Sequence, residues 1–277
     1  MEHRVSRDVD FVFLVIQVIL IFGVAFVYAN LGLGGGLLFV PILLSTGVPE
    51  SDVAVPISLT LTIATATSSV INHHRRGLVD FRLGSMLVAG ALVGALIGTY
   101  FTLVVLDERS FKAFFTAVLL LFGTYMLRDW MRNARSVDVD DDTKLTQPRL
   151  VGTAAATTGS GFLSGSMGIG GGLLNVPLLV YGLGRKTRKA IGTSSLLIIP
   201  TAVVGFFAYL VDLALQAGGL SVPSAFALIP MLMPVVFVGA YIGSRWGLEK
   251  LKTRSVALIF ILVLFVAAAK LVLDLIV

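Results

Sequence analysis

The sequence predicts an all-α integral membrane protein made of two repeats with inverted topology. The 277-residue chain is 56% hydrophobic and only 13% charged, and its mean hydropathy is +0.95. Soluble domains carry about 25% charged residues, so a chain this apolar needs a bilayer around it. The sequence also contains a repeated glycine-rich segment: residues 32–41 read GLGGGLLFVP, and residues 168–177, 136 positions later, read GIGGGLLNVP. We expect each repeat to comprise a helix and a re-entrant half-helix, followed by three transmembrane helices.

Ten apolar segments predict the individual helices. They lie at about 11–29, 34–46, 53–71, 83–105, 111–131, 150–166, 170–182, 190–211, 225–244 and 255–276. The segments 34–46 and 170–182 are too short for a helix that crosses about 30 Å of hydrocarbon at about 1.5 Å per residue. Each starts in a glycine run and contains a proline, Pro41 or Pro177, which should bend or end the helix. We therefore interpret both segments as half-helices that return to the side from which they came.

The positions of the basic residues predict the orientation in the membrane. Sixteen of the 21 Lys and Arg residues lie in four loops, at 72–82, 128–149, 183–189 and 245–254. Short basic loops stay on the cytoplasmic side of a membrane, so we expect these loops inside and both termini outside. A first repeat at 1–131 and a second at 149–277 then have opposite orientations, joined by a cytoplasmic linker at 132–148. Repeats of this kind are typical of secondary transporters.

The glycine runs predict an anion site near the middle of the membrane. Consecutive glycines allow the backbone to leave the helical conformation and turn. The half-helix that follows starts with unpaired N–H groups at the positive end of its dipole. Two such ends facing each other would form one compact anion site. The predicted substrate-binding residues are Gly34, Gly35, Gly36, Gly170, Gly171, Gly172, Asn30, Asn175, Ser58, Thr193 and Ser194. The alternative is that the glycines only permit close helix packing, as small-xxx-small motifs do.

Hydroxyl groups follow both half-helices. Ser58 and Ser194 are 136 positions apart, and Thr193 precedes Ser194 in the segment IGTSS. A hydroxyl can donate to an anion without adding a fixed charge, but it can also bond to the carbonyl four residues earlier or to a neighbouring helix. For most threonines at 60–67 we favour the second role. For Ser58, Thr193 and Ser194 both roles stay open.

Two halves that each open with GxGGGxxxxP, and an IGTSS segment after the second run, resemble the sulfite exporter TauE/SafE family over about 11–276. The resemblance implies a secondary transporter that exports small organosulfur oxyanions, such as sulfite or sulfoacetate, across an inner membrane. It adds weight to the glycines 34–36 and 170–172, and to Thr193 and Ser194. The first half reads VPIS where the second reads IGTS, which argues against a symmetric use of hydroxyls. The alternatives are an anion channel or facilitator, and a permease for another small carboxylate or sulfonate.

Ionisable residues are scarce in the apolar segments. His73 and His74 end one segment just before Arg76, and histidine titrates near neutral pH. Proton coupling or gating is one interpretation, and two interfacial histidines in a basic loop is the other. No apolar segment pairs a histidine with a second candidate base, and no HExxH motif or cysteine is present, so an intramembrane enzyme is a remote alternative.

We therefore expect no enzymatic activity, cofactor, metal site or nucleic-acid partner. The expected partners are a small anionic substrate, the lipid bilayer and, as a candidate coupling ion, the proton. A membrane scaffold without transport is the remaining class, and in that case added bulk at Gly35 or Gly171 would alter folding alone.

Overall fold

All regular secondary structure in the described residues is helical. The computed structural model describes residues 2–46, 48, 51–132, 147–216, 223–250 and 253–276. Its helices are α1 (Glu2–Leu31), α2 (Gly36–Ser45), α3 (Ser51–His74), α4 (Phe81–Val105), α5 (Glu108–Arg132), α6 (Gln147–Met167), α7 (Gly172–Pro177), η1 (Leu178–Gly182), α8 (Thr187–Gln216), η2 (Ser224–Ala227), α9 (Leu228–Lys250) and α10 (Thr253–Ile276). The predicted all-α class is confirmed. The predicted linker at 132–148 falls almost entirely outside the described residues.

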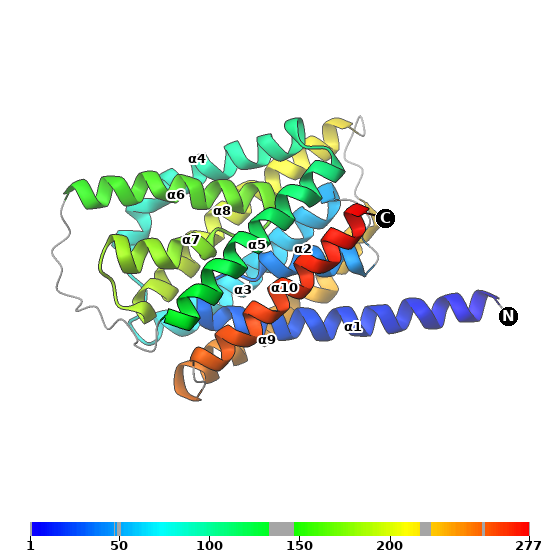
Figure 1. Ribbon diagram of the computed structural model, residues 1–277, viewed down its shortest axis with the longest axis horizontal. Helices are drawn as coiled ribbons and strands as arrows, with labels where there is room; N and C mark the ends of the chain where they lie inside the picture. Colours follow the sequence, from blue (N-terminus) through cyan, green and yellow to red (C-terminus); the bar gives the residue numbers. More distant parts are fainter. Residues whose placement is uncertain are drawn as a thin grey trace.

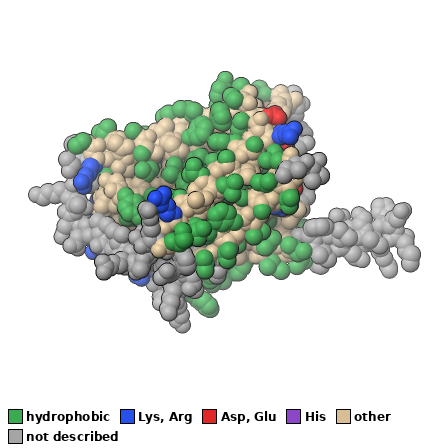
Figure 2. Space-filling view, viewed as in Figure 1, with side chains coloured by type: hydrophobic (Ala, Val, Ile, Leu, Met, Phe, Trp, Pro, Cys, Tyr) green, Lys and Arg blue, Asp and Glu red, His purple; other side chains and the backbone are tan. Residues whose placement is uncertain are grey.

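Six helical stretches of the described chain are long and apolar enough to cross a membrane. They are Leu14–Leu31, Ser51–His74, Phe81–Val105, Glu108–Arg128, Thr187–Gln216 and Ser224–Trp246. The other long helices are α6 and α10, of 21 and 24 residues. Hydrophobic side chains cover much of the face seen in Figure 2, with few charged groups among them. A large exposed apolar surface is what a multi-pass membrane protein presents to lipid.

Two short apolar helices occupy the positions predicted for the half-helices. They are α2 and the stretch Gly172–Gly182, which combines α7 with the π-helical turn η1. Both begin after a glycine in the left-handed region, Gly35 with φ 96° and Gly171 with φ 71°, a conformation that costs glycine no steric clash. At Pro177 the α-helix passes directly into the π-turn η1, so the helical stretch continues to Gly182, and Pro41 lies inside α2; neither proline ends its short helix. The short helices are confirmed, and their re-entry into a membrane stays a prediction.

The two halves of the chain interleave in one bundle. Helix α1 packs along α9, and α4 packs along α6, so the first helix of each half lies against the fourth helix of the other. Helices α3 and α8 contact each other; in addition α3 contacts α9, α8 contacts α4, and α5 packs on α10. Each pairing has a counterpart when the halves are exchanged. This is the packing expected of two related repeats.

The bundle has two distinct ends. Figure 1 shows both chain termini at one end of the long axis, which we call the terminal end. The α3–α4 and α7–α8 connections lie at the opposite end, joined by an ion pair between Asp80 and Arg185. We call this the basic end, because its described residues include Arg75, Arg76, Arg82, Arg185, Lys186, Arg188 and Lys189. Which end faces the cytoplasm stays a prediction.

Small residues bring α4 and α6 into backbone contact. A Cβ at Gly94 would collide with the carbonyl oxygen of Thr158, and a Cβ at Gly98 with that of Phe162. On the other helix, a Cβ at Gly161 would collide with the carbonyl of Ala91. Close approach of this kind lets membrane helices associate by packing alone.

We predict that Gly94→Ala destabilises the protein by about 1–3 kcal/mol, because the added methyl group must push α6 away from α4. Gly159→Ala is the matched control, since Gly159 lies on α6 with open space around its Cα. Thermal unfolding of the two variants in detergent measures the difference. Equal midpoints for both variants would show that the contact does not hold the helices together.

Candidate substrate site at the glycine turns

The two glycine turns lie against each other inside the bundle. We call the turns 32–35 and 168–171, with Gly36 and Gly172, the glycine junction; all of these residues are buried. A Cβ at Gly36 would collide with the carbonyl of Gly168, and a Cβ at Gly172 with the carbonyl of Gly32. The structure thus brings the two glycine runs together in direct backbone contact. At these points the contact leaves no space for a ligand in this conformation.

Each turn accepts a hydrogen bond from one buried serine, which lies on a helix of the other half. The hydroxyl of Ser58 on α3 donates to the carbonyl of Gly168 at 3.0 Å. The hydroxyl of Ser194 on α8 donates to the carbonyl of Gly32 at 2.8 Å. The two donors and the two acceptors are each 136 positions apart, so the bonds are counterparts in the two halves. We call them the crossed serine bonds.

The N–H groups that open the two short helices have no acceptor among the described residues. The first bonds of α2 come from its third and fourth residues and reach the carbonyl of Gly35, and α7 repeats this arrangement at Gly171. The N–H groups left without an acceptor are those of Gly36, Leu37, Gly172 and Leu173. Buried backbone donors are rarely left unpaired, and these lie at the positive ends of helix dipoles. The junction therefore holds a set of donors suited to a negative ligand.

Thr62 and Ile198 cover both turns from α3 and α8. A Cβ at Gly34 would lie 3.1 Å from Cγ2 of Thr62 and 3.1 Å from Cδ1 of Ile198. A Cβ at Gly170 would lie 2.5 Å from Cγ2 of Thr62 and 2.9 Å from Cγ2 of Ile198. Both side chains are fully buried, and the Oγ1 of Thr62 has no hydrogen-bond partner.

Sequence reasoning missed Thr62, because it grouped this residue with threonines that bond to their own helix. Thr60 and Thr65 do so, donating to the carbonyls of Ile57 at 2.6 Å and Leu61 at 2.9 Å. The 136-residue offset between the halves could have identified Thr62. It pairs Thr62 with Ile198, just as it pairs Ser58 with Ser194.

Three predicted binding residues are bonded to other groups. The Nδ2 of Asn30 donates to the carbonyl four residues earlier at 2.9 Å. The Oδ1 of Asn175 accepts from the hydroxyl of Ser160 at 2.5 Å. The hydroxyl of Thr193 accepts from the N–H of Asp80 at 3.0 Å, in the α3–α4 connection. The structure therefore brings together the glycines and the two serines, while Thr193 serves a contact at the basic end.

The basic end is closed over α8. Asp80 approaches Arg185 to 3.3 Å, which links the α3–α4 and α7–α8 connections. A Cβ at Gly192 would collide with the carbonyl of Leu78 and lie 3.0 Å from the Cβ of His73. Together with the Thr193 contact, these interactions hold the α3–α4 and α7–α8 connections against each other and against the start of α8.

His73 lies fully buried below this closure. Its Nδ1–H donates to the carbonyl of Ser69 at 2.8 Å, and its Nε2 has no partner. The hydroxyl of Ser69 donates to the carbonyl of Ala29 at 3.1 Å and lies 3.0 Å from the hydroxyl of Ser195. The Ser69 hydroxyl also lies 3.3 Å from the Nδ1 of His73, so Ser69 contacts His73, the end of α1 and Ser195, the neighbour of Ser194.

The other two candidates for gating lie at the surface. His74 is exposed and meets Phe81 edge to face, with 5.1 Å between ring centroids. Arg76 is exposed, and its guanidinium donates to the carbonyl of Arg245 at 3.4 Å. Of the three predicted gating residues, His73 alone is in the interior.

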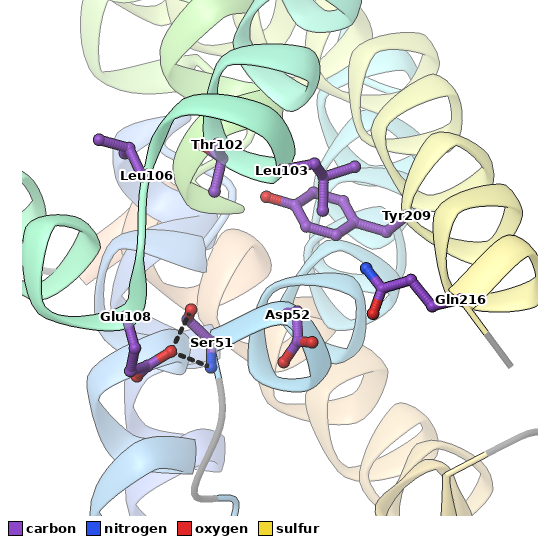
Figure 3. A pocket seen from close by; sticks show the side chains of 8 residues that line it. All are labelled: Ser51, Asp52, Thr102, Leu103, Leu106, Glu108, Tyr209 and Gln216. Atoms are coloured by element: carbon purple, nitrogen blue, oxygen red, sulfur yellow. Dashed lines mark hydrogen bonds between the residues drawn. The ribbon is translucent and has the colours of Figure 1, made fainter.

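A pocket of about 280 Å³ opens at the terminal end (Figure 3). Its polar lining consists of Ser51, Asp52, Thr102, Glu108, Tyr209 and Gln216. Glu108 accepts from the N–H of Ser51 at 3.0 Å and from its hydroxyl at 2.6 Å, and it pairs with Lys112 at 3.2 Å. One role of Glu108 is thus to anchor the start of α3.

The inner wall of the pocket is connected to the glycine junction. The hydroxyl of Tyr209 points toward Thr102 in Figure 3. Both hydroxyls donate to the carbonyl of Ser166, Thr102 at 2.9 Å and Tyr209 at 3.5 Å, and Ser166 precedes Gly168 by two residues. Tyr209 is 136 positions after His73, so counterparts in the two halves lie on opposite sides of the junction.

Comparison with known proteins finds an exporter family and probable membrane transporters. A family model described as "Sulfite exporter TauE/SafE" matches residues 17–271. The chain is 26% identical over 265 residues to "Probable membrane transporter protein YunE" of Bacillus subtilis (strain 168), covering 88% of this chain and 92% of the relative. It is 30% identical over 175 residues to a "Probable membrane transporter protein" of Xylella fastidiosa (strain 9a5c), covering 62% and 65%. No solved structure matches the chain.

We predict that Ser194→Ala lowers the free energy of unfolding by about 1–3 kcal/mol, because the buried carbonyl of Gly32 loses its donor. Ser85→Ala is the control, since the Ser85 hydroxyl is exposed and bonds within its own helix. Thermal unfolding in detergent reports the change. If both variants unfold at the same temperature, the crossed serine bonds do not stabilise the closed junction.

Proposed function

The chain belongs to the sulfite exporter TauE/SafE family of membrane transporters, and on this premise we propose that it is a secondary transporter that exports small organosulfur oxyanions. Sulfite and sulfoacetate are the expected substrates. The proposed site is the glycine junction, near the midplane of the bilayer. The observation that carries the proposal is the set of unpaired N–H groups at Gly36, Leu37, Gly172 and Leu173.

Loading of this site requires the two turns to separate. Separation frees the hydroxyls of Ser58 and Ser194 from their carbonyl partners, and both can then donate to the anion. Each broken bond costs about 1–3 kcal/mol if its groups stay unpaired. Charge-assisted bonds to an oxyanion are stronger than the neutral bonds they replace, so the substrate can stabilise the open junction.

We infer that the two repeats are inverted and that exchange between their two arrangements moves the substrate. Helix α2 leads from the junction to Ser51 at the terminal end, where Glu108 also lies. Helix α7 and η1 lead from the junction to Arg185 at the basic end. In this conformation the basic end is closed and the terminal end is hollowed by the pocket. An exchange of the two repeats would reverse this, as in alternating access.

The charges at the two ends support loading at the basic end and release at the terminal end. The described arginines and lysines of the basic end attract an anion. The terminal end carries Asp52, Asp107, Glu108 and Asp212, and a hydrogen bond from the Ser110 side chain lowers the pKa of Asp107. Arg109 and Lys112 lie beside them, and Lys112 pairs with Glu108, so the acidic groups outnumber the basic ones among these residues and disfavour capture of an anion from that side. With the basic end in the cytoplasm, the asymmetry favours export.

His73 is the proposed proton-coupling residue. It is buried, its Nε2 is unpaired, and Ser69 connects it to the end of α1. A proton on Nε2 would place a positive charge on the same side of the junction as the basic loops. His74 and Arg76 are then surface groups near the mouth of the pathway.

We predict that purified protein in liposomes accumulates ³⁵S-labelled sulfite with saturable kinetics and that unlabelled sulfite inside the liposomes accelerates this uptake. A carrier shows such counterflow because its site must reorient, whereas an open channel does not. Protein-free liposomes are the control, and sulfoacetate should compete for uptake. Uptake without saturation or counterflow would favour the channel alternative. No uptake of any small oxyanion would refute the proposed function.

We predict that an imposed pH gradient changes sulfite transport by the native protein and that His73→Gln removes this dependence. Glutamine cannot titrate, so the variant no longer couples a proton to the junction. His74→Gln is the control, because His74 lies at the surface. An equal response to the gradient in native protein and His73→Gln would exclude His73 as the coupling residue.

A further inference from the structure

We propose that the ion pair between Asp80 and Arg185 is a gate that an anion opens. Arg185 is then the first binding residue for the substrate at the basic end, and the carboxylate of Asp80 occupies the place of the substrate while the site is empty. The ligand class is a small oxyanion, since a carboxylate already fills this position. The inference rests on the proposed function, because it adds a loading site to the transport of an anion through the glycine junction.

The ion pair joins connections from the two halves of the chain, at a place that solvent reaches. Asp80 ends the α3–α4 connection, Arg185 lies in the α7–α8 connection, and Oδ2 of Asp80 lies 3.3 Å from the guanidinium. The side chains of Asp80 and Arg185 are 25% and 15% exposed. An anion from solution can therefore reach Arg185 and replace the carboxylate, because both offer oxygens of the kind that a guanidinium binds.

Asp80 is connected to the glycine junction through α8. Its Oδ1 accepts from the N–H of Leu83 at 2.9 Å, which fixes Asp80 at the start of α4. Its own N–H donates to the hydroxyl of Thr193 at 3.0 Å. The next residue, Ser194, donates to the carbonyl of Gly32 at 2.8 Å. Movement of Asp80 away from α8 therefore releases a contact one residue from a crossed serine bond.

Arg185 is connected to the junction through the second short helix. Its N–H donates to the carbonyl of Leu179 in η1 at 3.0 Å, and Gly184 before it turns the chain with φ 64°. The π-turn η1 continues α7, which begins in the junction at Gly172. Both partners of the ion pair are thus attached to segments that contact the glycine turns, and breaking the pair removes a charged contact between these segments.

The other cations of the basic end are less suited to a loading site. Five of them are exposed, namely Arg75, Arg76, Arg82, Lys186 and Arg188. Exposed charges attract an anion, but salt screens this attraction beyond about 8 Å at physiological ionic strength. The side chain of Arg185 is mostly buried and already holds an oxyanion, the carboxylate of Asp80. Because this carboxylate competes with every incoming anion, only an anion that binds Arg185 better can open the gate.

Labelling of a single cysteine tests whether the ion pair is a gate. The chain has no cysteine, and Ala190 is fully buried in a cluster with Leu83 of α4 and Leu179 of η1, so Ala190→Cys supplies one buried thiol. In full-length protein in detergent, adding Asp80→Asn should raise the maleimide labelling rate by roughly threefold or more, because asparagine keeps the cap of α4 but loses the charge. Lys112→Gln is the matched control, since Lys112 forms its ion pair within one helix. Equal rates for Asp80→Asn and Lys112→Gln would overturn the gate.

Sulfite binding tests whether Arg185 is the loading residue. Asp80→Asn and Arg185→Gln both break the ion pair, but only Asp80→Asn keeps the guanidinium. By calorimetry in detergent, Asp80→Asn should bind sulfite more tightly than Arg185→Gln by roughly tenfold or more, because Arg185→Gln loses a hydrogen bond between charged groups. Arg188→Gln removes an exposed charge nearby and should bind sulfite almost as the native protein does.

The outcomes of this binding test separate the inference from the proposed function. Equal sulfite affinity of Asp80→Asn and Arg185→Gln would show that the ion pair is a structural contact alone. Equal losses in Arg185→Gln and Arg188→Gln would show that the basic end attracts anions only through its total charge. Either result would overturn the loading role of Arg185 while the proposed function stands. A native protein that binds and transports no small oxyanion would overturn both.

Discussion

Two backbone carbonyls, those of Gly32 and Gly168, face the opposite half of the chain and accept a serine hydroxyl there. The rest of the site depends on this pair of contacts. They are possible because Gly36 and Gly172 have no Cβ to keep the turns apart. The N–H groups of the first two residues of α2 and of α7 have no acceptor among the described residues. We propose that an anion binds to these donors once the turns separate.

The two halves of the bundle make related contacts around the glycine junction. Outer helices of one half pack on the other half, with α1 on α9 and α4 on α6. Related sequences in the two halves make the same types of contact on either side of the junction. His73 and Tyr209, which share the 136-residue offset, lie on the closed and the hollowed side respectively. Under the proposed alternating access, the two sides would exchange these roles.

The sequence was sufficient to predict the helical class and the two short helices, and it placed Ser58 and Ser194 beside the glycine turns, where their role as substrate ligands stays a prediction. All of these follow from composition, length or duplication. The sequence could not predict which of two adjacent helical residues faces the junction. Thr193 and Ser194 are adjacent, yet one bonds to Asp80 and the other to Gly32. Successive residues of a helix are rotated by about 100°, and the face that meets another helix is set by tertiary packing. The same rotation between successive helical residues explains why His73 is buried and His74 is exposed.

No lysine or arginine lies among the described residues of the glycine junction, and physical chemistry explains why. A buried lysine or arginine would be costly in the closed state, because its charge would lack both water and a partner. It would also hold a bound anion so firmly that release would be slow. Backbone N–H groups and hydroxyls offer weaker, neutral donors that can be covered by Thr62 and Ile198 when no ligand is present. Affinity can then stay low enough for turnover.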